Sequence, residues 1–82
     1  MQYEIHFKPG ALKDGKKIPK QELAQIFKRI KELEDDLSGD VKHLTDFTPE
    51  YRLRVGNYRV LFEVQGNEVI IYRIRHRKDI YK

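Results

Sequence analysis

Arginines are the side chains of this sequence that are best suited to binding and stabilising negative charge. Arginine carries a planar fork of N–H donors, which can hold a phosphate through two parallel hydrogen bonds. Six of the seven arginines lie within 26 residues in the second half of the chain: Arg52, Arg54, Arg59, Arg73, Arg75 and Arg77. Such a cluster predicts a polyanionic partner. The plain alternative is a basic surface that only keeps a small protein in solution.

The net charge of +4 has the same uneven distribution. Residues 1–40 hold eight Lys or Arg and eight Asp or Glu, so they are neutral, whereas residues 41–82 hold nine against five. The excess positive charge therefore belongs to the half that carries the arginines.

Two further side chains near the arginines could exchange protons, His76 and Tyr81. Cleavage of an RNA strand needs a group that helps the 2′-hydroxyl lose its proton, cations around the phosphorane, and a donor for the leaving oxygen. Arginine is always charged and cannot titrate. We expect no metal and no cofactor, because arginines can supply the positive charge. His76 is equally well interpreted as structural, and Tyr81 as an apolar plug on a sheet edge.

Alternating apolar and polar residues predict the strands that position these groups. Three such runs, 51–55, 58–64 and 68–74, are separated by Gly56-Asn57 and by residues 65–67, which is typical of consecutive hairpins. Pleating places Arg52 and Arg54 opposite the apolar set of their strand, hence away from the core. For the last strand both alternating sets begin apolar, so its orientation stays open.

The first half predicts one strand and one or two helices. Residues 3–7 alternate until Pro9-Gly10 stops the strand, and a short helix is possible at 11–16. Apolar residues at helical spacing predict a helix from Pro19 to Leu37, stopped by Ser38-Gly39. Residues 41–49 look like a connection, with Leu44 and Phe47 packed beneath it. The whole is an α+β fold with helices on one face of a sheet.

Length and composition fit one domain spanning residues 1–82. There is no cysteine, hence no disulfide or thiolate site, and no apolar run approaches the length of a membrane span. Without a recognisable signal peptide, a cytoplasmic protein is expected.

The segment from Tyr51 to Val64, together with His76-Arg-Lys-Asp-Ile-Tyr81, resembles the RelE/ParE superfamily of toxins. The resemblance implies a small antiparallel sheet packed against N-terminal helices, and the toxin of a type II toxin–antitoxin pair. RelE-like members are metal-independent endoribonucleases that cut messenger RNA in the ribosomal A site. A short acidic antitoxin is the implied partner, in a toxin–antitoxin hetero-oligomer.

The resemblance also assigns roles. Arg52 and Arg54 match the basic pair of the first hairpin strand, and Arg59 matches the arginine of the next strand. Arg54, Arg59 and Arg77 would then stabilise the phosphate and the transition state, and Tyr81 would assist proton transfer. The implied site residues are, for catalysis, Arg54, Arg59, Arg77, Tyr81 and His76, and for RNA binding, Arg52, Arg73, Arg75 and Lys78.

This sequence departs from the family pattern in ways that affect those roles. The basic pair is Arg-Arg rather than lysine, which removes a titrating group and leaves the general base open. Arg75 rather than Arg77 is an alternative match for the closing arginine. Two other functions remain compatible with the resemblance: a ParE-like inhibitor of DNA gyrase, and a non-toxic relative that only binds an antitoxin.

Overall fold

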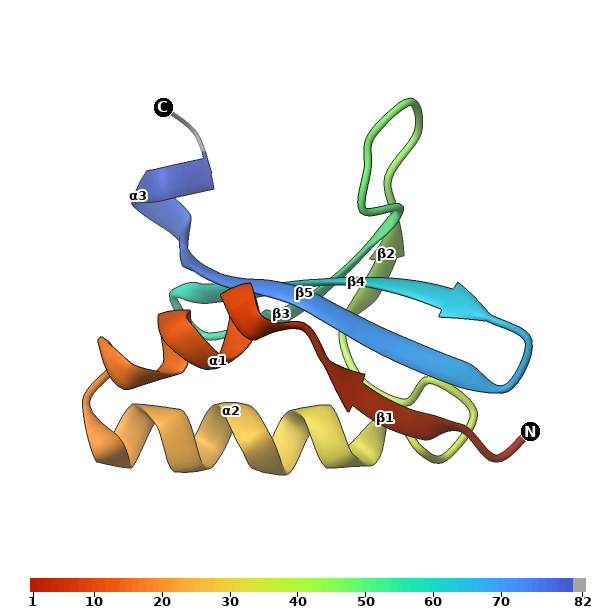
Figure 1. Cartoon of the computed structure of the whole chain (residues 1–82), viewed down its shortest axis with the longest axis horizontal. Helices are drawn as coiled ribbons and strands as arrows, with labels where there is room; N and C mark the ends of the chain where they lie inside the picture. Colours follow the sequence, from red (N-terminus) through yellow and green to blue (C-terminus); the bar gives the residue numbers. More distant parts are fainter. Residues whose placement is uncertain (81–82) are drawn as a thin grey trace.

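In the computed structural model, which describes residues 1–80, five strands form one sheet in the order β1-β5-β4-β3-β2. Figure 1 shows α1 and α2 together on one side of this sheet. The elements in chain order are β1 (Glu4–Phe7), α1 (Pro9–Lys16), α2 (Lys20–Glu32), β2 (Val41–His43), β3 (Tyr51–Val55), β4 (Tyr58–Gln65), β5 (Glu68–His76) and α3 (Arg77–Ile80).

The meander of β3, β4 and β5 confirms the prediction from alternation and turn residues. Two features of the sheet were not predicted. β1 pairs in parallel with β5, with Ile5 opposite Val69, and so forms one edge. β2 pairs with β3, with Val41 opposite Leu53, and forms the other edge within a segment expected to be only a connection.

The core lies between α2 and the sheet. Fully buried side chains of α2 and the residue that follows it meet fully buried side chains of β3, β4 and β5. These residues are Ile26, Ile30, Leu33, Leu53, Val60, Phe62, Val69 and Ile71.

The predicted end of the second helix is wrong. α2 ends at Glu32, not at Leu37, because Asp36 and Leu37 adopt positive φ angles of 53° and 56° that a helix does not permit. Leu33 is still fully buried just beyond the helix. The apolar spacing therefore predicted the burial of Leu33 correctly, but it did not predict that the helix ends before this residue.

Pro9 and Gly10 start α1 instead of only ending β1. Proline suits the first helical turn, where its missing N–H has no partner to lose. Ala11 is almost completely buried, and α1 packs against β5. This contact brings the first helix beside the strand that carries Arg73 and Arg75.

A bulge in β5 settles which face its residues occupy. Leu61 lies opposite Arg73 but Phe62 lies opposite Ile71, so Tyr72 is an extra residue in the pairing. Before the bulge Val69 and Ile71 face the helices, and after it Ile74 does. Both alternating sets thus contribute to the core, one on each side of Tyr72.

Within residues 1–80, no helix is both long and apolar enough to cross a membrane.

Candidate nucleic-acid interface

The face of the sheet opposite α1 and α2 is not covered by a helix layer. Figure 1 shows α3 rising beyond this face at one side and the loop of residues 44–50 rising at the other. α3 and this loop therefore flank the open face on two sides.

Basic residues form two rows across this open face. Residues directly opposite each other on neighbouring strands share a face, with their Cβ atoms about 5 Å apart. The first row, which we call the arginine row, consists of Arg54, Arg59 and Arg75. The second row, which we call the mixed row, consists of Lys42, Arg52 and Leu61. Arg73 lies opposite Leu61 on β5, but its side chain binds Asp14 of α1 instead of joining this row.

Adjacent like charges in a sheet repel each other and destabilise it. In the arginine row three guanidinium groups on three neighbouring strands follow one another without an intervening carboxylate. An anion placed over the row removes this repulsion. The row therefore favours a ligand with negative charge.

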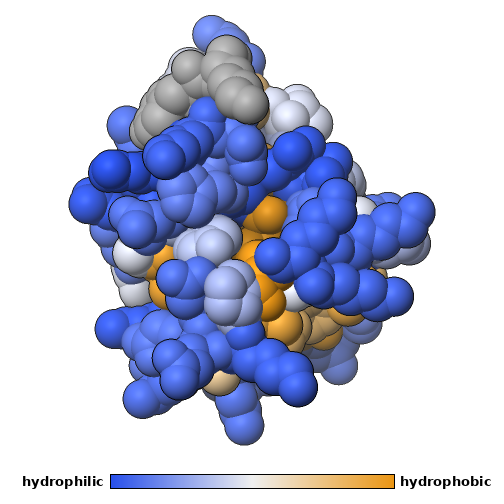
Figure 2. Space-filling view, turned by 90° about the vertical axis from the view of Figure 1, so that its left-hand side faces the viewer, coloured by the Kyte–Doolittle hydropathy of each residue, from blue (hydrophilic) through white to orange (hydrophobic). Residues whose placement is uncertain are grey.

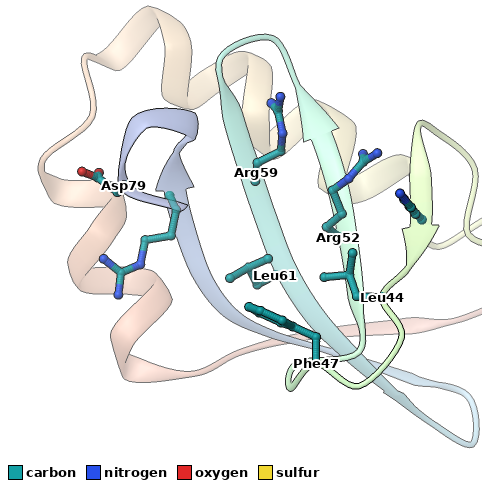
Figure 3. Close-up of a pocket in the computed structure, with 8 residues that line it drawn as sticks. Leu44, Phe47, Arg52, Arg59, Leu61 and Asp79 are labelled. Carbon is teal, nitrogen blue, oxygen red and sulfur yellow. The ribbon is translucent and has the colours of Figure 1, made fainter. Parts of the chain in front are cut away.

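Residues from both rows, from the loop and from α3 line a groove with a volume of about 590 Å³. Figure 3 shows these side chains, with Leu44, Phe47 and Leu61 grouped at one side and Arg52 and Arg59 at the other. The lining residues are Lys42, Leu44, Phe47, Arg52, Arg59, Leu61, Arg75 and Asp79. Four cations and one carboxylate thus surround a partly apolar floor.

Arg59 is the most rigidly held cation of the groove. Its side chain is 8% exposed, and Nη1 donates to the backbone oxygens of Gly56 and Tyr58 at 2.9 and 3.0 Å. Gly56 lies in the turn between β3 and β4, and Tyr58 is the first residue of β4. Since a guanidinium has five N–H donors, the other nitrogens of the fork remain to bind a ligand in a fixed orientation.

Arg52 makes longer polar contacts than Arg59, and Arg54 is exposed. Arg52 Nη1 lies 3.3 Å from the backbone oxygen of Asp40 and 3.7 Å from its carboxylate. Arg54 is exposed, and it does not line the groove although it belongs to the arginine row. We therefore expect Arg54 to attract a ligand at the rim.

Arg73 is occupied by a structural ion pair. Its Nε and Nη2 donate to the two carboxylate oxygens of Asp14 at 2.8 and 2.9 Å. Burial by itself would raise the pKa of Asp14, but the hydrogen bonds from Arg73 and from the Ile74 N–H outweigh it and lower the pKa. Its charge is already compensated, so Arg73 is a weaker candidate for RNA binding than its neighbours.

His76 does not line the groove, although it lines a second, smaller pocket together with Arg75 and Asp79. Tyr58 packs against the core, and its cross-strand partner His76 shares that face, with the two rings 5.2 Å apart in a T-shaped arrangement. His76 Nδ1 accepts a hydrogen bond from the Lys78 N–H at 3.2 Å. His76 therefore lies on the helix side of the sheet.

Tyr58 is tied to the helix layer as well. Burial, together with a 2.9 Å hydrogen bond that its hydroxyl donates to Glu22, raises the pKa of Tyr58.

Figure 2 views the molecule from the end that holds α3 and the turn between β3 and β4, where a narrow hydrophobic strip lies between hydrophilic surfaces.

The remaining predicted site residues follow β5. Arg77 and Lys78 are exposed in α3 and do not line the groove, whereas Arg75 does. The alternative match of Arg75 to the closing arginine is thus compatible with the geometry. Tyr81 lies outside the residues that the structure describes.

Sequence reasoning missed Lys42, Phe47 and Asp79. Phe47 was expected to pack beneath the loop, which is wrong: its side chain is 54% exposed. Lys42 was missed because a three-residue strand leaves too short an alternation to recognise. Asp79 enters the lining only because α3 turns back at the end of β5.

One group of side chains outside the groove has the composition of a metal site. The ligand atoms of Glu4, His6 and Glu68 lie within 4.8 Å of one another on β1 and β5. His6 Nε2 is 3.3 Å from Glu68, and all three side chains are substantially exposed. Exposed acidic groups of this kind are common on protein surfaces without a bound ion.

Comparison of the sequence with known proteins identifies a toxin family and a related toxin. The family model described as the ParE toxin of a type II toxin–antitoxin system, parDE, matches residues 5–81. Toxin RelE3 of Methanocaldococcus jannaschii is 36% identical over 83 residues, covering 95% of this chain and 94% of that protein.

Solved structures show the same fold. In the RelB–RelE antitoxin–toxin complex from Methanococcus jannaschii, a chain 35% identical superposes with a TM-score of 0.78, covering 93% of this chain and 94% of the other. The toxin–antitoxin complex RelBE2 from Mycobacterium tuberculosis contains a chain 26% identical, with a TM-score of 0.80 and coverage of 94% and 100%.

Proposed function

The chain belongs to the ParE toxin family of type II toxin–antitoxin systems, and from this premise we propose that it inhibits translation by cutting messenger RNA on the ribosome. The family expected from the segment between Tyr51 and Tyr81 is thereby confirmed. The similarity to a toxin named RelE3 favours the RNA-cleaving branch.

The groove supports this proposal chiefly through Arg59. In RNA cleavage the 2′-oxygen forms a bond to the adjacent phosphorus while the bond from phosphorus to the 5′-oxygen breaks. Negative charge grows on the phosphoryl oxygens, and donors fixed in advance stabilise that charge most effectively. Arg59 is such a donor, because the backbone carbonyls of Gly56 and Tyr58 hold Nη1, and Arg75 lies opposite it on β5.

Proton transfer needs groups other than arginine. The proton of the 2′-hydroxyl must pass to a base, and the departing 5′-oxygen must gain a proton. We propose Tyr81, the tyrosine of the closing motif, as one of these groups. Lys42 and Asp79 are titratable side chains that line the groove, whereas His76 lies on the other face. We therefore assign His76 to positioning the start of α3.

Mapping transcript ends in cells tests the activity. The chain is expressed briefly from an inducible promoter, and the 5′ ends of a reporter transcript are compared with and without a functional start codon. We expect new ends inside the coding region only when the reporter is translated. Growth arrest with intact messenger RNA would overturn the proposal.

The match to the ParE family model supports a second candidate function, inhibition of DNA gyrase by direct binding. It predicts induction of the DNA-damage response and accumulation of cleaved DNA, with no new transcript ends. The same induced culture can be used for both assays.

We also propose an acidic antitoxin as the partner of this chain in the cytoplasm. The related structures are complexes of RelE with RelB, and the groove carries four cations for one carboxylate. Co-expression with the product of the adjacent gene, followed by affinity purification, should yield a stable complex that suppresses toxicity. Failure of the two chains to co-purify would contradict this partner.

A further inference from the structure

Phe47 is a large apolar side chain that the fold leaves exposed inside the groove. It projects from the loop of residues 44–50, and 54% of its surface is accessible. Phe27, the other exposed phenylalanine, packs its ring against Phe7 at 5.8 Å. Among residues 1–80 no ring pairs with Phe47, so its face is available to a ligand.

The surroundings of Phe47 combine apolar surface with positive charge. Figure 3 shows its ring directed towards Leu61, with Leu44 beside it. Leu61 lies beside Arg52 in the mixed row. An apolar platform therefore lies within the basic surface, next to the cations that line the same groove.

A ligand that uses both parts must carry a flat, weakly polar ring close to negative charge. A nucleotide within a single strand has this composition, because its unstacked base offers an aromatic face beside the backbone phosphates. Bases within a duplex already stack on one another and present only their edges. The arrangement thus favours a single-stranded nucleic acid over a duplex.

We propose that Phe47 is a base-stacking residue of this groove, and that one base of a single-stranded RNA lies on its ring while the flanking phosphates contact Arg52, Arg59 and Arg75. This inference rests on the proposed function and specifies how the substrate is held. Asp79 also lines the groove and repels phosphate, but four cations outnumber it.

Binding of short RNA to the purified full chain tests the proposal without the ribosome. The probe is a 12-nucleotide single-stranded RNA with one 2-aminopurine, whose fluorescence falls when it stacks on an aromatic ring. We expect the wild type to quench the fluorescence on binding. We expect Phe47→Ala to bind the RNA about tenfold more weakly, within the range found for loss of one base–aromatic stack. Phe47→Leu should be weakened similarly, and Phe47→Tyr should bind like the wild type.

Two controls separate stacking from other effects. Phe27→Leu changes an exposed phenylalanine on α2, outside the groove, and should leave RNA binding unchanged. An RNA with abasic sites should bind wild type and Phe47→Ala equally, because it keeps the phosphates but offers no ring. Thermal unfolding of each variant verifies that the fold is intact.

Equal affinity of Phe47→Ala and wild type for the normal RNA would overturn the proposal. So would weaker antitoxin binding of Phe47→Ala with unchanged RNA binding, because Phe47 would then serve a protein partner. Quenched binding by a chain that cuts no transcript would uphold the stacking role while contradicting the endonuclease. Cleavage in cells together with absent quenching would uphold the endonuclease and contradict the stacking role of Phe47.

Discussion

Asp14 and Arg73, which are 59 residues apart in the sequence, join α1 to β5 through two hydrogen bonds of 2.8 and 2.9 Å. The same carboxylate accepts the backbone N–H of Ile74 at 2.9 Å. Beyond the end of β1, the edge of β5 would otherwise present that N–H without a partner strand. Asp14 therefore both attaches the first helix and completes the hydrogen bonding of the strand that carries Arg75.

We expect Asp14→Asn to lower the free energy of unfolding at pH 7 by about 2 kcal/mol, since two charge-assisted hydrogen bonds are lost. The lowered pKa of Asp14 determines how its contribution to the free energy of unfolding depends on pH. The carboxylate stabilises the fold above its unfolded pKa, near 4, and this contribution disappears as the pH falls through the lower folded pKa.

Urea unfolding at pH 7 and at pH 2 measures both effects. The difference between wild type and Asp14→Asn should be large at pH 7 and small at pH 2. Asp35→Asn, which changes an exposed carboxylate beyond α2, should stay within about 0.5 kcal/mol of wild type. If Asp14→Asn lowered the free energy of unfolding by the same amount at both pH values, the stabilising role assigned to the charge of Asp14 would be contradicted.

Arg59→Gln should reduce RNA cleavage about 100-fold, as the loss of one fixed donor does in other transition-state sites. Arg59→Lys should recover little, because a single ammonium cannot both bind the carbonyls of Gly56 and Tyr58 and present a fork. Cleavage of a ribosome-bound messenger with purified components gives the rate. Arg29→Gln, which removes the same charge on α2, is the matched control, and a similar loss there would indicate an effect of net charge.

The salt dependence of RNA binding should distinguish Arg54 from Arg73. Arg54 is exposed beside the groove, so Arg54→Gln should lower the slope of log affinity against log salt by about 0.7, the value for one phosphate contact on a single strand. Arg73→Gln should change the slope much less, because Asp14 already neutralises that charge. Equal changes for the two variants would show that Arg73 reaches the RNA.

Tyr81→Phe should lower cleavage at least tenfold and leave RNA affinity nearly unchanged, because it removes a proton-transfer hydroxyl and keeps the ring. Tyr72→Phe serves as control, since Tyr72 lies at the β5 bulge with Lys8 5.4 Å from its ring centre. Weaker binding with a normal rate of cutting would instead assign Tyr81 a stacking role.

Alternation and turn residues were sufficient to predict the three-stranded meander, because each of its strands has one buried face. They could not predict the bulge at Tyr72, since Val69, Ile71 and Ile74 are all apolar and only the pairing with β4 decides which face each takes. The end of α2 was misplaced for a related reason: Leu37 continues the helical spacing although its backbone has left the helix.

Some residues of the candidate site could likewise be predicted from the sequence, whereas others could not. The arginine face of β3 followed from pleating, so Arg52 and Arg54 were predicted to point away from the core. His76 was expected near them, but the register that sets it opposite Tyr58 places it among the helices. Lys42 and Phe47 enter the groove through a short edge strand and its loop, whose positions depend on contacts with β3 that the local sequence does not encode.

The parallel pairing of β1 with β5 has a consequence for the synthesis of the chain. β1 is made first and β5 last among the five strands, and Ile5 must find Val69 before that edge can close. Contacts so distant in sequence form late in folding. Arg75 lies on β5 as well, so the arginine row is complete only once this last strand has left the ribosome and paired with β4.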